Sequence, residues 1–181
     1  MPRIWNKLMR HWQKSVNFAP VCGGWNSKKL RLPDRSDAIP MPLYAYVPGQ
    51  NMRHPEDWFD AIKDTVLEGM PVADLQHTAA FRAGLIYLDA GYYWECHEVL
   101  EAVWLQTPKG TAERDMVQAL IQLANARLKV RMRRPRAAQR LCNMVEGHLQ
   151  EYASDQPILG VLPDSVLVHV AQVRCNLDGR Y

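Results

Sequence analysis

The sequence predicts an all-α protein, and more specifically a compact bundle of antiparallel helical hairpins. Three observations favour this fold class. Beyond residue 53, apolar residues recur with the spacing of one face of a helix in segment after segment. Prolines and glycines stand at the ends of these segments, where they begin and end helices. No segment shows the strict alternation of apolar and polar residues that is typical of a half-buried strand.

The first predicted helix begins at His54-Pro55, with acidic residues in its first turn, and ends before Gly69. Further helices are predicted, in chain order, at about Val72–Ala90, Tyr93–Gln106, Thr111–Arg133, Pro135–Tyr152 and Pro163–Asn176. The residue spacing in the second and third helices resembles that of a tetratricopeptide-type hairpin. The residues at this spacing are Gly84, Tyr87, Gly91, Tyr93, Cys96 and Pro108. We expect the small residues among these to let the two helices approach closely.

Two regions are expected along the 181-residue chain. Residues 1–52 form a basic N-terminal extension, rich in proline and glycine and partly irregular, and residues 53–181 form the helical bundle domain. Residues 1–53 contain nine Lys/Arg and two acidic residues, whereas residues 54–181 contain thirteen and seventeen. Residues 1–17 have a basic amphipathic pattern, typical either of a helix at an anionic membrane surface or of a packing arm.

Composition narrows the class of protein. Hydrophobic residues make up 48% and charged residues 23% of the chain, which is enough to bury one core. The four cysteines are far apart and form no CxxC pair, which favours buried thiols in a reducing compartment. There is no secretory signal pattern, and no apolar run reaches the roughly 18–20 residues that cross a bilayer. We therefore expect a cytoplasmic protein without a transmembrane segment.

The stretch YWECHEVLEAVW, residues 93–104, concentrates polar chemistry in a helix that otherwise has the pattern of a buried one. On a helical wheel, His97, Glu98 and Glu101 share the side opposite the apolar face. Trp94 lies between them and Trp104 lies beside His97, whereas Glu95 lies farther round and is expected to be exposed.

Three chemical uses suit this spacing, beside the alternative of a solvated polar face. His97 and Glu101, four residues apart, could ligate one divalent metal (Zn, Mn or Fe), because HExxE resembles the HExxH pattern of zinc sites. Glu98 or Glu101 could instead be a general base oriented by His97. Finally, the carboxylates could bind a cationic or polyhydroxylated ligand.

A second polar stripe makes a site more plausible than a solvated face. The predicted helix at Thr111–Arg133 is apolar around most of its circumference, so it should be largely buried. Its polar residues form one narrow stripe that needs hydrogen-bonding partners: Gln118, Gln122, Asn125 and Lys129. We expect this stripe to face His97, Glu98 and Glu101 across a small cavity, with a thin solvent-facing seam as the alternative.

Other charged residues carry weaker signals. His54 heads a helix and could swing toward the site, although a capping or surface role is favoured, and His77, His148 and His169 are interpreted as structural. Residues 127–140 contain seven Lys/Arg and no acidic residue, a pattern that can bind phosphate or RNA. The run lacks interleaved aromatic residues, and cations are favoured at a helix C-terminus in any case, so a nucleic-acid partner is disfavoured.

Residues 76–152 resemble the bacterial and archaeal family called domain of unknown function 309. The resemblance rests on three motifs: Phe81-x-x-Gly84, Gly91-Tyr92-Tyr93-Trp94-Glu95-Cys96-His97-Glu98-x-x-Glu101-x-x-Trp104, and Leu120-Ile121-Gln122-Leu123-Ala124. It implies an all-α bundle and no established activity. Members are sometimes labelled metal-dependent hydrolases, which by analogy directs attention to His97, Glu98, Glu101 and Gln122.

Two hypotheses follow from the sequence. In the first, His97 and Glu101 are metal ligands, Glu98 is the catalytic base, and Trp94, Trp104, Gln118, Gln122, Asn125 and Lys129 contact a small polar ligand, with hydrolysis as the first reaction expected. In the alternative, the protein is a non-catalytic helical interaction module for a protein partner. The polar cluster is then a hydrogen-bond network that fixes helix register. A homodimer is compatible with either hypothesis.

Overall fold

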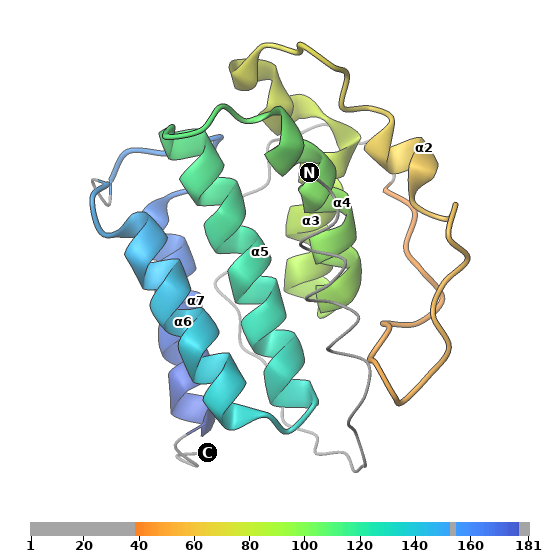
Figure 1. Ribbon diagram of the computed structural model, residues 1–181, viewed down its shortest axis with the longest axis vertical. Coiled ribbons are helices and arrows are strands. Elements are labelled where there is room, and N and C mark those ends of the chain that lie inside the picture. Colours follow the sequence, from red (N-terminus) through yellow and green to blue (C-terminus); the bar gives the residue numbers. More distant parts are fainter. Residues whose placement is uncertain (1–38, 153–154, 178–181) are drawn as a thin grey trace.

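The computed structural model describes residues 39–152 and 155–177, and within these ranges the fold is a bundle of helices, as predicted (Figure 1). The helices are α2 (Asp60–Lys63), the 3-10 helix η1 (Val72–His77), α3 (Ala79–Ala90), α4 (Tyr93–Gln106), α5 (Ala112–Arg131), α6 (Pro135–Leu149) and α7 (Pro163–Leu177). The described ranges contain no strand beyond one isolated bridge between Ile158 and Val161. The amphipathic helix predicted for residues 1–17 lies outside the described residues.

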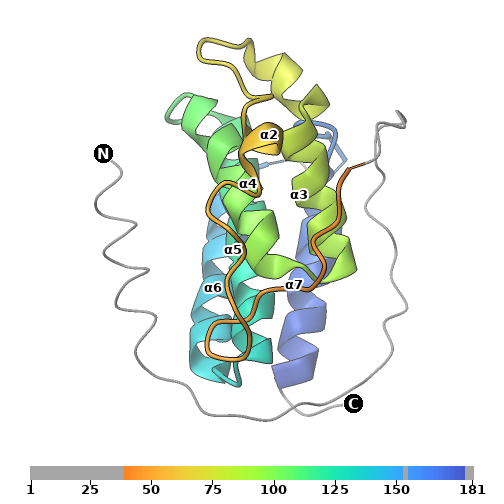
Figure 2. The ribbon, with the colours of Figure 1, turned by 90° about the vertical axis from the view of Figure 1, so that its right-hand side faces the viewer.

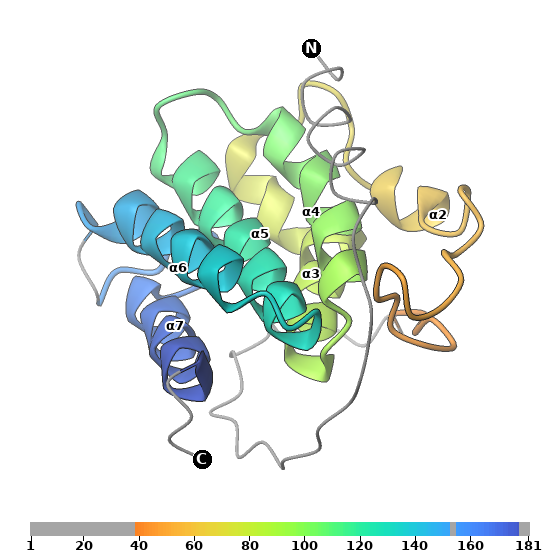
Figure 3. The ribbon, with the colours of Figure 1, turned by 60° about the horizontal axis from the view of Figure 1, so that its bottom comes forward.

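Helix α5 is the centre of the bundle. It packs against α4 on one side and against α6 and α7 on the other, while α3 packs on α4 (Figures 1 and 3). The antiparallel hairpin α3–α4 therefore contacts the antiparallel hairpin α5–α6 through α5. Helix α7 packs against both helices of the second hairpin. Among the helices of the described ranges, none has the length and apolar character that a membrane crossing requires.

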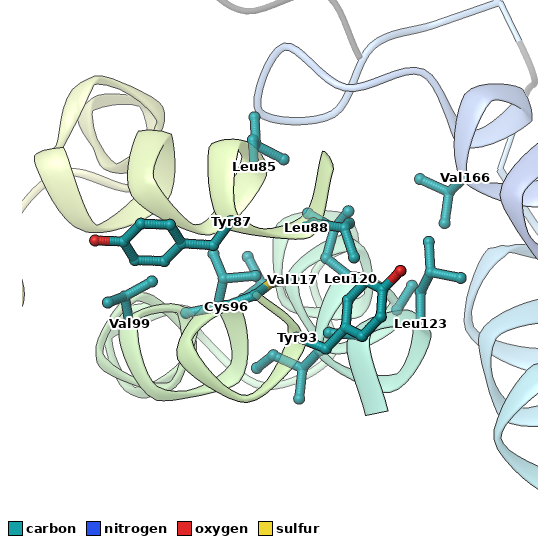
Figure 4. Packing of buried hydrophobic residues seen from close by; sticks show 14 of the residues in the cluster. Leu85, Tyr87, Leu88, Tyr93, Cys96, Val99, Val117, Leu120, Leu123 and Val166 are labelled. Carbon is teal, nitrogen blue, oxygen red and sulfur yellow. The ribbon is translucent and has the colours of Figure 1, made fainter. Parts of the chain in front are cut away.

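The core lies where α3, α4, α5 and α7 meet (Figure 4). Tyr87 of α3 packs near Cys96 and Val99 of α4, and Leu120 and Leu123 of α5 extend this layer toward α7. The first hairpin is tight because Gly84 faces Leu100, so that a Cβ added at Gly84 would lie 2.5 Å from Leu100 Cγ. This contact confirms the close approach that the small residues predict.

Local signals explain where the helices begin and end. Thr78 caps α3 by accepting a hydrogen bond from the Phe81 amide at 3.1 Å, and Thr111 caps α5 by accepting one from the Arg114 amide. Gly91 ends α3 with a φ of 86°, a left-handed conformation that suits glycine. Pro135 occupies the first turn of α6.

Two predicted helices were wrong in extent. The segment predicted to be helical from residue 55 is α-helical over Asp60–Lys63 and otherwise folds into turns, because Trp58 and Phe59 both pack toward His54. The helix predicted at residues 72–90 is interrupted at Thr78, whose backbone is extended (ψ 150°) and whose hydroxyl caps α3. In both places, packing or capping overrides the apolar periodicity.

Residues 39–59, the 39–59 segment, run over the side of the bundle formed by α3 and α4 (Figure 2). Tyr46 and Val47 are buried in the core, and the Tyr87 hydroxyl donates a 2.6 Å hydrogen bond to the Pro40 carbonyl. This segment contributes the residues that complete one of the two polar clusters on α4.

Candidate functional site

Helix α4 carries two separate clusters of polar residues on different sides. One is sealed beneath the 39–59 segment and centres on Glu95. The other faces α5 and contains His97 and Glu101. The sealed cluster was not anticipated from the sequence, whereas the cluster facing α5 was.

The contact between the α4 and α5 stripes is direct. The Nδ1 atom of His97 lies 3.0 Å from Oδ1 of Asn125 in hydrogen-bonding geometry. His97 is buried, with 6% of its surface exposed, and Asn125 is half-buried. The expectation that the polar stripe of α5 faces that of α4 is therefore met at this pair.

A small hollow opens beside His97. Its lining comes from both helices: His97, Glu101 and Trp104 of α4, and Gln118 and Ile121 of α5. The volume open to the centre of a water molecule is about 10 Å³, which is room for roughly one water molecule. The hollow thus brings together four of the residues that the sequence singles out, in a space too small for an organic substrate.

Trp104 is held in place by an arginine that the sequence did not single out. The guanidinium of Arg114 lies 3.9 Å from the centroid of the Trp104 ring, within the range of a cation–π contact. The same guanidinium donates hydrogen bonds to the Trp104 carbonyl, at 3.1 Å, and to the Thr107 carbonyl. These contacts hold the C-terminal end of α4 against α5 and fix the position of Trp104 in the lining of the hollow.

Glu98 lies at the edge between the two clusters. Its side chain is 20% exposed, and burial raises the pKa of its carboxyl group, an effect opposed by the nearby His97 and Arg53. A guanidinium nitrogen of Arg53 is 4.0 Å from Glu98 Oε2, and the same group lies 5.0 Å from the centroid of the Trp94 ring. Arg53 is thus a further charged residue at this edge that the sequence did not single out.

The other predicted ligand-binding residues lie away from the hollow. Gln122 and Lys129 are buried along α5, and burial, together with the charge of Arg134, lowers the pKa of Lys129 to about 7. Trp94 is 4% exposed, and its ring packs edge-on against Tyr46. Trp94 therefore belongs to the aromatic layer beneath the 39–59 segment and does not line the hollow.

The sealed cluster corrects two expectations. Glu95 is fully buried rather than exposed, and its Oε1 accepts hydrogen bonds from His54 Nε2 at 2.7 Å and from the Tyr46 amide at 2.6 Å. His54 is likewise buried and stacks on Tyr44 instead of capping a helix at the surface. A helical wheel shows that Glu95 borders the apolar face, but it cannot show a partner 41 residues earlier in the chain.

Part of the basic run is used to hold the bundle together. The Arg127 guanidinium contacts His169 Nδ1 at 2.6 Å, which joins α5 to α7, and it also donates to the Leu88 carbonyl. Arg131 donates to the Gly91 carbonyl at 2.6 Å and lies over the Tyr93 ring. These contacts give Arg127, Arg131 and His169 structural roles, in agreement with the interpretation of His169 from the sequence.

The side chains at the hollow offer few ligands for a metal ion. His97 and Glu101 offer one imidazole and one carboxylate, and Gln118, which carries an amide, lines the hollow from α5. No group of three or more His, Cys, Asp or Glu able to hold a metal occurs within the part of the chain that the structure describes. Catalytic zinc sites use three protein ligands, so this donor set fits only a weakly held ion with water in its remaining positions.

The helices that carry the hollow lie in a segment that matches one protein-family model. Residues 81–141 match the model of a family described as "Domain of unknown function (DUF309)". No curated protein matches the chain, and neither does any solved structure. The matched segment includes α4, α5 and every residue that lines the hollow, whereas His54 and Arg53 lie outside it.

Proposed function

We propose that this chain, a member of the DUF309 family through residues 81–141, binds one small cation in the hollow between α4 and α5. One observation carries the proposal: the hollow has space for about a single water molecule and is lined by an imidazole, a carboxylate and an amide. A space of this size suits one small ion, and the imidazole and carboxylate in its lining favour a positive charge.

A divalent metal is the form of cation that these side chains suit best. His97 and Glu101 are four residues apart on α4, so they are neighbours on one face of the helix. Imidazole nitrogen and carboxylate oxygen together are ligands for Zn, Mn or Fe. Because protein ligands are few, we expect weak, exchangeable binding.

Hydrolysis is the first reaction class to test if the protein is an enzyme. When bound, a divalent metal supplies Lewis acidity and lowers the pKa of a bound water. Glu98, adjacent to His97 and largely buried, is the candidate base.

The test is elemental analysis of protein purified without chelator or affinity metal, followed by calorimetric titration with Zn²⁺, Mn²⁺ and Fe²⁺. His97→Ala and Glu101→Gln remove one ligand each, and Glu151→Gln, at an exposed position outside the site, is the matched control. We expect binding by the parent and the control, and at least tenfold weaker binding by the two site variants. A parent protein that binds none of the three ions refutes the proposal.

The alternative function, a non-catalytic interaction module, is favoured by the hydrogen bond between His97 and Asn125. This bond joins α4 to α5 and could serve only to fix their register. In that case His97→Ala lowers the free energy of unfolding by about 1–3 kcal/mol, and the parent takes up no ion. Ion binding by the parent therefore separates the two functions, and pull-down experiments become the next step only if it is absent.

A further inference from the structure

The imidazole of His97 makes its hydrogen bond through one nitrogen. Nδ1 lies 3.0 Å from Asn125 Oδ1, and within the described ranges Nε2 has no hydrogen-bond partner. Nε2 is not fully buried, so it reaches solvent-accessible space. His97 lines the hollow, and Nε2 is the ring nitrogen that its hydrogen bond to Asn125 leaves free to face that space.

This arrangement determines the position of the imidazole proton. A neutral imidazole carries one N–H, and the nitrogen that bears it must be the one facing a hydrogen-bond acceptor. The carbonyl oxygen of the Asn125 amide has no hydrogen to donate, so Nδ1 carries the proton. Nε2 is then left with its lone pair.

We propose that Asn125 is a positioning residue that fixes His97 as the Nδ1–H tautomer and so presents Nε2 to the hollow as an electron-pair donor. The statement about the tautomer stands on the contact between Asn125 and His97. The identity of the ion rests on the function proposed above. The same division of labour, with one ring nitrogen held by an outer partner and the other bound to metal, is general among metal-binding histidines.

The lining of the hollow also defines the class of ligand. The His97 imidazole and the Glu101 carboxylate are electron-rich, and with Gln118, Trp104 and Ile121 they line a space for about one water molecule. An anion at this point would face the lone pair of His97 and the negative charge of Glu101. The ligand is therefore an electron-pair acceptor, and a divalent metal ion is the acceptor that fits the space.

The tautomer can be read directly from ¹⁵N-labelled histidine by long-range nitrogen–proton correlation, on ligand-free protein at a pH where His97 is neutral. The spectrum of His97→Gln assigns the His97 signals. Asn125→Leu keeps a similar side-chain volume but removes the acceptor, and Asn125→Asp keeps an acceptor oxygen. Asn176→Leu, at an exposed position on α7, is the matched control.

We expect the parent, Asn125→Asp and Asn176→Leu to show the Nδ1–H tautomer, and Asn125→Leu to lose it. In a Zn²⁺ titration, Asn125→Leu should bind about 10–100-fold more weakly than the parent, while Asn125→Asp should bind at least as tightly. An Nε2–H tautomer in the parent overturns the proposal, as does an unchanged tautomer in a folded Asn125→Leu protein. If the tautomer depends on Asn125 but no Zn²⁺ binds, the positioning role is supported and the proposed ion-binding function fails.

Discussion

Glu95 and Glu101 lie on the same helix, yet their surroundings differ completely. Glu95 is fully buried and accepts hydrogen bonds from His54 and from the Tyr46 amide. Glu101 lines a hollow that is open to water. A buried carboxylate needs partners to offset the loss of water, and Glu95 has two of them at Oε1, although its buried Oε2 has none. Glu95 therefore contributes to the fold, whereas Glu101 remains available to a ligand.

The first prediction concerns Glu95. Glu95→Ala removes the acceptor for two buried donors and leaves His54 without its partner. We expect the free energy of unfolding to fall by about 3 kcal/mol, as is typical when one member of a buried pair is removed. Urea denaturation followed by tryptophan fluorescence measures this loss.

Glu151→Ala is the control for that measurement, because Glu151 is exposed and lies outside both clusters. Its effect should stay within about 0.5 kcal/mol of the parent. If Glu95→Ala also changed stability by less than about 1 kcal/mol, the pair would not anchor the 39–59 segment.

The sequence predicts the contact of a polar residue when its partner lies on a neighbouring predicted helix. His97 and Asn125 each fall on a polar stripe of an otherwise apolar helix, so their contact follows from pairing two stripes. The partner of Glu95 lies in a segment of turns 41 residues earlier, and no periodic pattern predicts that contact.

Two helical glycines of the bundle have opposite surroundings. Gly84 in α3 faces the fully buried Leu100 of α4, and an added Cβ would overlap its side chain. Gly147 in α6 has no atom within 4 Å of the position that a Cβ would take. The two positions therefore test close packing against helix propensity within the same fold.

The second prediction uses this pair. Gly84→Ala should destabilise the protein by about 1–3 kcal/mol through overpacking against Leu100. Gly147→Ala should stabilise it by roughly 0.5–1 kcal/mol, because alanine loses less backbone entropy in a helix. Thermal or urea unfolding of both variants gives the signs. A Gly84→Ala protein as stable as Gly147→Ala would mean that α3 and α4 are not in close contact.

Whole helices could be predicted where propensity and packing agree. The bounds of α4, Tyr93–Gln106, match the prediction, since a left-handed Gly91 precedes the helix and Thr107-Pro108 follows it. The region before Ala79 was predicted less well. There, Thr78 caps a new helix through a local hydrogen bond to the Phe81 amide, and Trp58 packs toward His54; apolar periodicity encodes neither effect.

For the molecule as a whole, the buried Lys129 makes stability depend on pH. Its pKa in the folded protein is lowered to about 7 from an ordinary value of 10.5, chiefly by burial. Between these two values the unfolded chain binds a proton that the folded protein does not, so the free energy of unfolding rises with pH across this interval. Below a pH of about 7 both the folded and the unfolded chain carry the charge of Lys129, so its contribution to stability no longer changes with pH.

The third prediction follows from this sign. Lys129→Met should be more stable than the parent near pH 6, and its advantage should shrink as the pH rises from about 7 toward 10.5. Urea denaturation of both proteins across this range measures the difference, and the other titrating groups are common to both. A constant difference would show that Lys129 does not titrate as burial predicts.

The long-range contacts of the 39–59 segment have a consequence for the order of folding. The bonds of Glu95 to Tyr46 and His54, and of Tyr87 to Pro40, close loops of 49, 41 and 47 residues, whereas α3–α4 and α5–α6 are local hairpins. Loop closure costs entropy, so the hairpins should assemble before the segment docks. The segment that docks last should also open first, and the Tyr46 amide should then exchange its hydrogen faster than the central amides of α5.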